Sequence, residues 1–459
     1  MRKKSIWFAL LALVVGVLAL TAAGCGDDGG ESGAVGNTGG DTGGPTGDVE
    51  SLPSSSCGDL QTGDAGADVL IASDLPLQGS SRTQTVQMNK AIVQVLEQND
   101  WKAGDLNIGF QECDDATAAA GKWDSAKCST NAGLYAENED VVGVIGTFNS
   151  GCAAIIIPVL NQAPGGGVGM VSPANTYVCL TTAGPGCEKT EPDKYYPSGS
   201  RNYIRMVAHD AYQGAAAAQF MKDQGVTNVY ILNDKEAYGL GVAQNFRNAA
   251  KSLGLGVAGF EAWDGKATSY EGLMTKVKAT GADALFLGGL IDENGGQLIK
   301  DKVKVLGPND GDVLLFAPDG FTTQTTIDES GQKNAAGMFS SVAGVPPDQL
   351  TGSGKEFIDS FKADLGSEPV EPYSAYGAQA AQVLLDAIAQ AGDDRAGIIQ
   401  QLFATNVTGG ILGDFEITPD GDPTAGPITV YKAGAQFDPE TVITPEQSLV
   451  EAAMGGGSR

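Results

Sequence analysis

The chain has 459 residues, 42% of them hydrophobic, which is more than one ordinary core needs, so two domains of average size are expected. It carries 56 Asp and Glu against 28 Lys and Arg, and a net charge of −28 argues against binding the phosphate backbone of nucleic acids. His209 is the single histidine, which excludes a His-rich metal site and argues against a Ser–His–Asp triad.

The first 25 residues have the pattern of a secretory signal. Arg2, Lys3 and Lys4 precede an apolar run over residues 6–20, and three small residues stand before Cys25. A run of about 15 residues is short for a membrane span. The ending resembles a bacterial lipobox, with Ala22 in place of the usual Leu, and this resemblance implies cleavage before Cys25 and lipidation of its thiol. An ordinary signal peptide with an unrelated cysteine is the alternative.

Residues 26–56 predict a disordered tether. They contain ten Gly and eight Ser or Thr, with no Lys, Arg or aromatic residue, and cannot bury enough apolar surface to fold. A coil of this length spans roughly 30 Å, which suits a soluble domain held near a membrane.

The cysteines indicate an oxidising compartment. If Cys25 is lipidated, six remain, an even number that suits disulfides. We expect a local Cys179–Cys187 bond because the two flank a Gly-Pro-Gly loop. For the others we favour Cys113–Cys152, since both follow predicted strands at one sheet edge, which would leave Cys57 with Cys128. Metal binding is the competing interpretation, but no C-x-x-C spacing is present, and we expect neither metal nor cofactor.

The globular part alternates short apolar strands with helical stretches. The predicted strands are residues 69–72, 106–110, 141–146, 168–171, 229–232, 257–260, 284–287 and 313–317. The predicted helices are residues 85–98, 116–137, 153–161, 212–224 and 242–253. Alternation of this kind predicts an α/β fold with parallel sheets covered by helices, and its two successive runs predict two similar lobes.

Small polar residues follow the carboxyl ends of these strands, where open α/β sheets bind ligands. Ser150 and Thr176 are expected near the starts of helices or loops, where free N–H groups favour a carboxylate. Asp319 offers a negative charge to an ammonium group. Together the three suit a zwitterion. The alternative is that they are ordinary turn residues and helix caps.

Seven short segments in order give the chain a family resemblance. They are residues 113–116 (CDDA), 144–150 (VIGTFNS), 170–176 (MVSPANT), 234–239 (DKEAYG), 288–289 (GG), 318–320 (PDG) and 372–376 (PYSAY). Between about residues 68 and 432 the chain resembles the type I periplasmic solute-binding proteins, in particular the leucine/isoleucine/valine-binding group of ABC importers.

The resemblance implies two Rossmann-like lobes joined by three crossings of the chain. Lobe one would comprise residues 57–208 and 343–427, and lobe two residues 209–342 and 428–445. Residues 1–24 would be the lipoprotein signal peptide, 25–56 the lipidated cysteine and linker, and 446–459 a C-terminal tail. Ligand would lie in the cleft, and the lobes would close over it by a hinge motion.

Site residues are carried over by position. Ser150 matches the serine that holds the ligand carboxylate, and Thr176 matches a threonine that contacts both charged groups of the ligand. Asn175 matches a position whose backbone carbonyl meets the ammonium. Tyr238 matches a tyrosine of the second lobe, and Asp319 matches the acid that pairs with the ammonium.

The chain departs from this family at three places. Leu290 stands where a tyrosine often follows the Gly-Gly pair, and the family's disulfide positions fall on Thr117 and Asn149. Ser80, Ser81 and Arg82 replace bulkier residues in the first loop; Arg82 either binds a further acid group of the ligand or balances nearby acids. Branched-chain specificity is therefore not carried over.

These observations favour a monomeric, lipid-anchored receptor, outside the cytoplasm, that delivers an amino acid or a related zwitterion to an ABC permease. A sensor or storage lipoprotein without a transporter, or a receptor for another solute such as an amide, remains the alternative. A secreted hydrolase would need a G-x-S-x-G nucleophile elbow, which is absent from the strand ends. We interpret His209 as a residue of the lobe crossing, Trp123 as a core or surface residue, and Tyr373 or Tyr376 as a possible cleft residue.

Overall fold

The computed structural model describes residues 49–184, 186–424 and 426–456. The predicted signal peptide, Cys25 and most of the predicted tether lie outside these residues. No helix among the described residues is both long enough and apolar enough to cross a membrane.

The first sheet has seven strands in the order β1-β4-β2-β7-β8-β9, and β3 pairs with β4 outside this path. The central strands run parallel, whereas β1 and β3 are antiparallel to β4. Their bounds are Gln61–Thr62 (β1), Val69–Leu75 (β2), Lys102–Ala103 (β3), Leu106–Asp114 (β4), Val141–Gly146 (β7), Gly169–Ser172 (β8) and Tyr203–Arg205 (β9).

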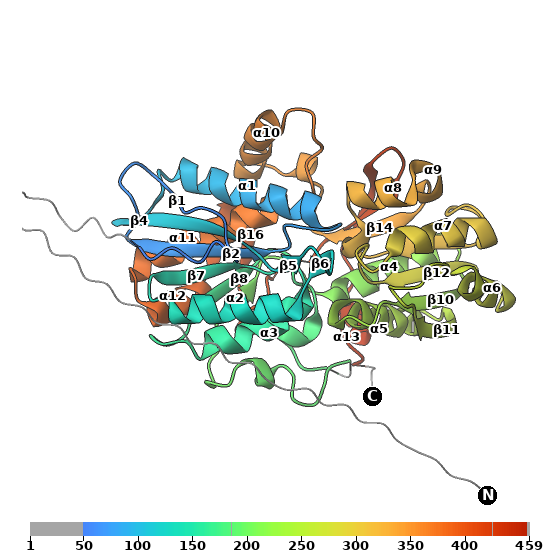
Figure 1. The fold of residues 1–459 in the computed structure, drawn as a ribbon. Helices are drawn as coiled ribbons and strands as arrows, with labels where there is room; N and C mark the ends of the chain where they lie inside the picture. Colours follow the sequence, from blue (N-terminus) through green and yellow to red (C-terminus); the bar gives the residue numbers. More distant parts are fainter. Residues whose placement is uncertain (1–48, 185, 425, 457–459) are drawn as a thin grey trace, which may run out of the picture. The chain divides into compact units, whose positions relative to one another are not determined.

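Helices cover both faces of this sheet (Figure 1), and the alternation of side chains along β2 shows why. Leu70 and Ala72 lie in the hydrophobic cluster that contains α2 and α3 residues, whereas Val69 and Ile71 lie in the cluster formed with α1 and α11. A strand buried on both faces reads as a continuous apolar run. The helices are α1 (Arg82–Gln98), α2 (Ser125–Glu137), α3 (Ser150–Asn161), α11 (Ser374–Ala391) and α12 (Arg395–Phe403).

The second sheet also has seven strands, in the order β11-β10-β12-β13-β14-β17-β18. The first five run parallel, and β17 and β18 are antiparallel additions at one edge. Their bounds are Asn228–Asn233 (β10), Gly256–Ala262 (β11), Ala284–Gly288 (β12), Leu314–Ala317 (β13), Phe339–Ala343 (β14), Ile428–Ala433 (β17) and Phe437–Ile443 (β18). The associated helices are α4 (Asp210–Asp223), α5 (Ala237–Ser252), α6 (Glu271–Ala279), α7 (Gly295–Leu306), α8 (Gln324–Ser330), α9 (Gln332–Ala335) and α13 (Gln447–Ala453).

The chain passes between the sheets three times. It leaves the first sheet after β9, returns after β14 to form α10 (Ser353–Leu365), α11 and α12, and then enters the second sheet again at β17. Phe357 and Leu384, from the returning segment, share a hydrophobic cluster with Ile71 and Val142 of the first sheet. We call the first sheet with its helices lobe one, and the second sheet with its helices lobe two. The predicted α/β class with two parallel-rich sheets is confirmed.

One predicted element is wrong in part. The predicted helix over residues 116–137 begins only at Ser125, because Asp124 caps it by accepting hydrogen bonds from the N–H groups of Ala126 and Lys127 at 3.0 and 3.1 Å. Residues before it form a small hairpin of β5 (Ala116–Thr117) and β6 (Lys122–Trp123). A second small hairpin, of β15 (Asn406–Gly410) and β16 (Gly413–Glu416), lies outside the main sheets.

The described residues contain three disulfide bonds, one of which has the expected local pairing, Cys179–Cys187. The two longer-range pairings favoured from the sequence are wrong: the bonds are Cys57–Cys113 and Cys128–Cys152. Cys57 reaches Cys113 because Ser56 and Gly58 hydrogen-bond to the end of β4 through Asp114 and Glu112. Cys128 and Cys152 lie on the adjacent helices α2 and α3.

Both ends of the described chain are more ordered than predicted. At the start, residues 49–56 were expected to belong to the disordered tether, but Leu52 is buried and its N–H donates to Gln111 Oε1 at 2.7 Å. At the other end, the expected tail contains α13, whose Leu449, Val450 and Ala453 are buried in a cluster with α4 and α5 residues.

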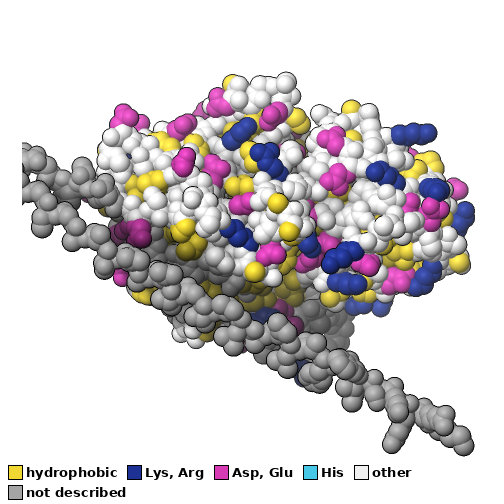
Figure 2. All heavy atoms as spheres, in the orientation of Figure 1, with side chains coloured by type: hydrophobic (Ala, Val, Ile, Leu, Met, Phe, Trp, Pro, Cys, Tyr) yellow, Lys and Arg dark blue, Asp and Glu magenta, His cyan; other side chains and the backbone are white. Residues whose placement is uncertain are grey.

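The surface of the described residues offers little apolar area. On the face in Figure 2, acidic side chains are scattered over both lobes. Val345 and Val442 are the exposed large hydrophobic residues of the described chain.

Candidate ligand-binding site

A narrow cavity, with a volume of about 10 Å³, lies where the carboxyl ends of strands from both sheets meet. Four of the predicted site residues line it: Ser150 and Thr176 of lobe one, and Tyr238 and Asp319 of lobe two. The other lining residues are Trp123, Phe148, Asn149, Gly151, Ala174, Glu236, Leu290 and Gly320. The structure thus brings together residues up to about 170 positions apart, as the strand-end argument expected.

The lobe-one side of the cavity offers hydrogen-bond donors to a ligand. Ser150 begins α3 after an extended Asn149, three residues earlier than the predicted start of this helix. The first N–H groups of a helix have no partner within it and lie at the positive end of its dipole. Thr176 Oγ1 is buried without a hydrogen-bond partner among the described residues. These groups can hold a ligand carboxylate.

The lobe-two side carries a buried carboxylate. Asp319 follows β13 and is 5% exposed. Its Oδ1 accepts hydrogen bonds from Tyr238 Oη and Gln213 Nε2, both at 2.6 Å, and its Oδ2 accepts one from Tyr373 Oη at 2.7 Å. Burial raises the pKa of Asp319, although these three bonds oppose the shift. All three donors are neutral, so a ligand ammonium would be the first cation to contact this group.

A second buried acid lies beside it. Asp210 begins α4 and is fully buried; its Oδ1 accepts a 3.3 Å hydrogen bond from Gln213 Nε2, and its Oδ2 has no partner among the described residues. Burial first, and then the charge of Asp319, raise the pKa of Asp210 well above its usual value. Neither Asp210 nor Gln213 was among the predicted site residues. The only sequence feature that pointed to them was that they closely follow His209, at the expected crossing between the lobes.

His209 itself serves the start of α4. It precedes this helix as its cap residue, and its Nδ1 accepts a hydrogen bond from the N–H of Ala211 at 3.3 Å. Burial lowers the pKa of His209 to about 4, so the neutral ring persists as an acceptor. The structure therefore gives it a structural role at the crossing and not a place in the cavity.

Asn175 and Arg82 are the two predicted site residues that do not line the cavity. Asn175 is fully buried; its amide donates to the carbonyls of Thr147 and Phe148 at 2.9 and 3.0 Å, and its own carbonyl accepts from Arg205 Nη1 at 3.0 Å. It fastens together the loops that carry Ser150 and Thr176. Arg82 begins α1 and is exposed.

Arg205 supports the same loops from behind the cavity. It is fully buried, and its Nε donates to Asp422 Oδ1 at 2.6 Å while its Nη1 also bonds the carbonyl of Tyr177 at 2.9 Å. Burial opposes its charge, but the carboxylate of Asp422 holds the pKa of Arg205 above its usual value. The buried pair joins the end of β9 to the third crossing segment.

Several hydrogen bonds hold the two lobes together around the cavity. Asp292 of lobe two accepts from the N–H groups of Ser80 and Ser81 at 3.0 and 3.2 Å and from Ser81 Oγ at 2.5 Å, at the start of α1. Burial raises the pKa of Asp292 to about 6, against the effect of the Ser81 bond. Lys122 of lobe one bonds Glu236 at 2.9 Å and also Glu293, both in lobe two.

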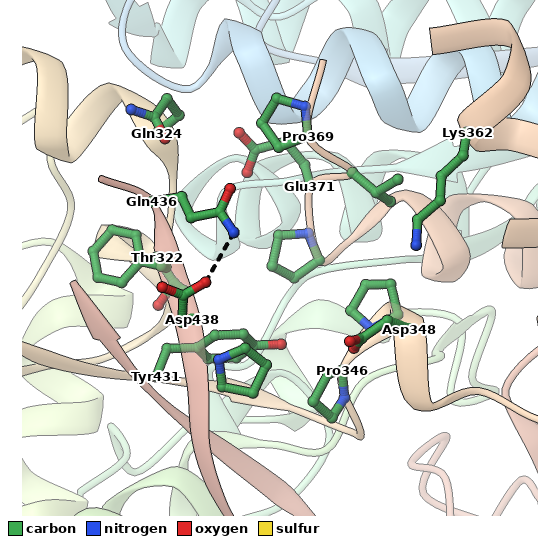
Figure 3. A pocket seen from close by; sticks show the side chains of 15 residues that line it. Thr322, Gln324, Pro346, Asp348, Lys362, Pro369, Glu371, Tyr431, Gln436 and Asp438 are labelled. Atoms are coloured by element: carbon green, nitrogen blue, oxygen red, sulfur yellow. Dashed lines mark hydrogen bonds between the residues drawn. The ribbon is translucent and has the colours of Figure 1, made fainter. Parts of the chain in front are cut away.

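A larger crevice of about 300 Å³ is lined by residues of both lobes (Figure 3). Thr322 and residues 369–372 line it, and the next residue, Tyr373, donates to Asp319 of the ligand cavity. Glu371 is 4% exposed there; it accepts a 3.4 Å bond from Thr323, and burial raises its pKa to about 7. Protonation of Glu371 therefore bears on the contact between the lobes.

Comparisons with known proteins agree with this architecture. The sequence model of a family described as periplasmic binding protein matches residues 108–437. A Leu/Ile/Val-binding protein homolog 1 from Brucella abortus is 26% identical over 376 residues, covering 81% of this chain and 91% of that protein. An amino acid binding protein from Pseudomonas aeruginosa is 24% identical and covers 80% of this chain and 90% of its own length.

Solved structures show the same fold. A leucine binding protein from Thermotoga maritima superposes with a TM-score of 0.70 at 23% identity, covering 82% of this chain and 99% of that one. A solute-binding protein of an ABC transporter from R. palustris, solved in complex with benzoate, gives a TM-score of 0.67 at 16% identity, with 83% and 97% covered.

The relatives and fold neighbours are described as solute-binding proteins and not as enzymes, and the family implies a location outside the cytoplasm. The family match spans well over half of the chain and includes the segments that form the cavity. The chain belongs to the periplasmic binding protein family.

Proposed function

We propose that this protein is a lipid-anchored receptor that captures an amino acid, or a closely related zwitterion, between its lobes and delivers it to an ABC permease. The observation that supports it most is the pairing of opposite ligand preferences in one cavity. The start of α3 and Thr176 suit a carboxylate, and Asp319, held only by neutral donors, suits an ammonium.

The charge of the cavity argues against a simple aromatic or aliphatic acid as ligand. Although one fold neighbour was solved with benzoate, here the buried carboxyl group of Asp319 lines the cavity, and a second buried acid, Asp210, shares Gln213 with it. A ligand with a carboxylate and no cation would leave Asp319 buried and uncompensated, which is costly.

Binding would proceed by closure of the lobes. Asp319 of lobe two bonds Tyr373 of lobe one, and Asp292 bonds Ser81 across the same boundary. Such contacts exist only when the lobes meet, so a ligand that bridges them favours the closed arrangement.

Isothermal titration calorimetry and thermal unfolding of the purified protein test the proposal. The panel contains the proteinogenic amino acids, their amides, small diamines and benzoate. A ligand at about 100 times its Kd adds roughly 2.7 kcal/mol of stability. Binding of amino acids but not of amides or benzoate supports the zwitterion site, and binding of benzoate alone contradicts it.

The anchor and the partner need separate experiments. Metabolic labelling with a radioactive fatty acid tests the lipid on Cys25, with Cys25→Ala as the unlabelled control. Co-purification of a permease and ligand uptake by cells distinguish a transport receptor from a sensor or storage lipoprotein of the same fold.

A further inference from the structure

One wall of the ligand cavity comes from Trp123, which lies outside the segments that suggested the family. Trp123 is half-buried, lines the cavity and packs against the hydrophobic cluster of α2 and α3. A side chain that both lines a cavity and remains partly exposed stands between the ligand and solvent. It occupies the region that the sequence predicted to be part of a helix.

The β5–β6 hairpin that carries Trp123 is fixed to lobe one at its turn. Residues Ala116 and Thr117 pair with Trp123 and Lys122. The carbonyl oxygen of Gly121 lies 1.8 Å from the point where a Cβ atom on Gly79 would be. The hairpin turn therefore sits directly on the loop before α1, in a contact that only glycine at position 79 permits.

The same hairpin is fixed to lobe two by Lys122. Lys122, next to Trp123, donates to Glu236 at 2.9 Å and to Glu293. All three side chains are largely shielded from solvent, with 26% of Lys122, 22% of Glu236 and 13% of Glu293 exposed. The hairpin strand that carries Trp123 is thus held from both lobes.

The position of the indole limits the space next to the proposed carboxylate site. A Cβ atom on Gly151 would lie 2.6 Å from Cζ2 and 2.7 Å from Cη2 of Trp123. Gly151 directly follows Ser150, so the six-membered ring lies against the start of α3. The remaining apolar wall, Phe148, Ala174 and Leu290, is buried, so a larger side chain would have to displace packed groups.

Resting on the proposed amino-acid function, we propose that the ligand has a small side chain, as in glycine, alanine or serine, and that the indole of Trp123 sets this limit. The cavity must hold the carboxylate and ammonium groups as well as the side chain, yet the space inside it that a water-sized sphere can enter is only about 10 Å³. A branched or aromatic side chain would meet the indole, which lies against Gly151 at the start of α3.

The test compares the affinities of glycine, alanine, valine and leucine for the full-length purified protein by calorimetry. The variants are Trp123→Phe and Trp123→Ala, with Trp101→Ala as the matched control, because Trp101 lies in the turn between α1 and β3 and not in the cavity. We expect wild type to bind alanine at least about tenfold more tightly than leucine. In Trp123→Ala this ratio should fall by about tenfold or more, since each methylene accommodated in an apolar pocket changes affinity by about 10–200-fold.

Trp123→Phe should give an intermediate ratio, and Trp101→Ala should keep the wild-type ratio. Unfolding midpoints measured without ligand show whether each variant is folded. If Trp123→Ala is not folded, the affinity ratio of Trp123→Phe is compared with that of wild type instead. Tight binding of leucine by wild type, or an unchanged ratio in both Trp123 variants, overturns the size limit and leaves the proposed function standing. If wild type binds no amino acid, the proposed function fails, and the size limit fails with it.

Discussion

Asp210 and Asp319, which are 109 positions apart in the sequence, share one amide group: Gln213 Nε2 donates to Oδ1 of both, at 3.3 and 2.6 Å. Asp319 has two further donors, whereas Asp210 has an oxygen without a partner among the described residues. Burial raises the pKa of both groups, that of Asp210 well above its usual value, and three hydrogen bonds oppose the rise at Asp319, which favours the charge on Asp319. The pair therefore presents Asp319 as the charged group for a ligand cation.

Removing that charge should weaken an amino-acid ligand. We expect Asp319→Asn to cost about 2–5 kcal/mol of binding free energy, because it leaves the ligand ammonium buried without its partner. Calorimetry with the best ligand of the panel measures the loss. Asp364→Asn, at an exposed position of α10, is the matched control and should bind as wild type does. Unchanged affinity in Asp319→Asn would contradict the ammonium assignment.

Glu371 should make the unliganded protein less stable as the pH rises. Burial raises its pKa from 4.5 to about 7, so between these values the folded state binds the proton more tightly than the unfolded state. This contribution to stability is complete below about pH 4.5 and is lost as the pH rises through 7, at a cost on the order of 1–3 kcal/mol by pH 8.

Urea unfolding of wild type and Glu371→Gln at pH 5 and pH 8 measures this contribution. The variant should change less between the two pH values than wild type does, because its side chain cannot ionise. Glu356→Gln, exposed on α10, should keep the wild-type dependence. Equal pH dependence in all three proteins would show that Glu371 titrates normally.

The contact of Asp292 with the start of α1 should favour closure without affecting ligand choice. We expect Asp292→Ala to raise the Kd of every bound ligand by a similar factor of about ten or more, because the three bonds to Ser80 and Ser81 form only between closed lobes and each is worth about 0.5–1.5 kcal/mol. Small-angle X-ray scattering with saturating ligand should show a more open average arrangement of the two lobes in the variant than in wild type. A change in the alanine-to-leucine ratio would instead place Asp292 in ligand discrimination.

The Cys57–Cys113 bond should hold the first described segment on the edge of the first sheet. The pair closes a loop of 56 residues, and its removal should cost about 3–4 kcal/mol by the chain-entropy relation. In Cys57→Ala/Cys113→Ala, limited proteolysis should cut near Leu52 before the rest of the chain. The Cys179–Cys187 bond closes a loop of only 8 residues. Its removal in Cys179→Ala/Cys187→Ala should therefore cost less stability. A larger loss from the short loop would contradict the entropic account.

Much of the site could be predicted because its residues follow strands. Ser150, Thr176 and Asp319 come after β7, β8 and β13, and parallel strands bring their carboxyl ends to one edge of each sheet. Trp123, Gln213 and Asp210 could not be placed in the same way. Trp123 lies on a hairpin inside an Ala-rich stretch that suggests helix, and Asp210 and Gln213 lie on a helix whose inward face depends on how the lobes pack.

By itself, the sequence determined the α/β class, the two successive lobes and the segments that reach the cleft, because hydrophobic periodicity and strand ends are local properties of the chain. The tertiary structure decided which cysteines pair, which acid shares Gln213 with Asp319, and that Trp123 lines the cavity. Each of these features depends on two segments that are distant in sequence and meet only in the folded protein. A local sequence pattern does not specify which distant segments come into contact.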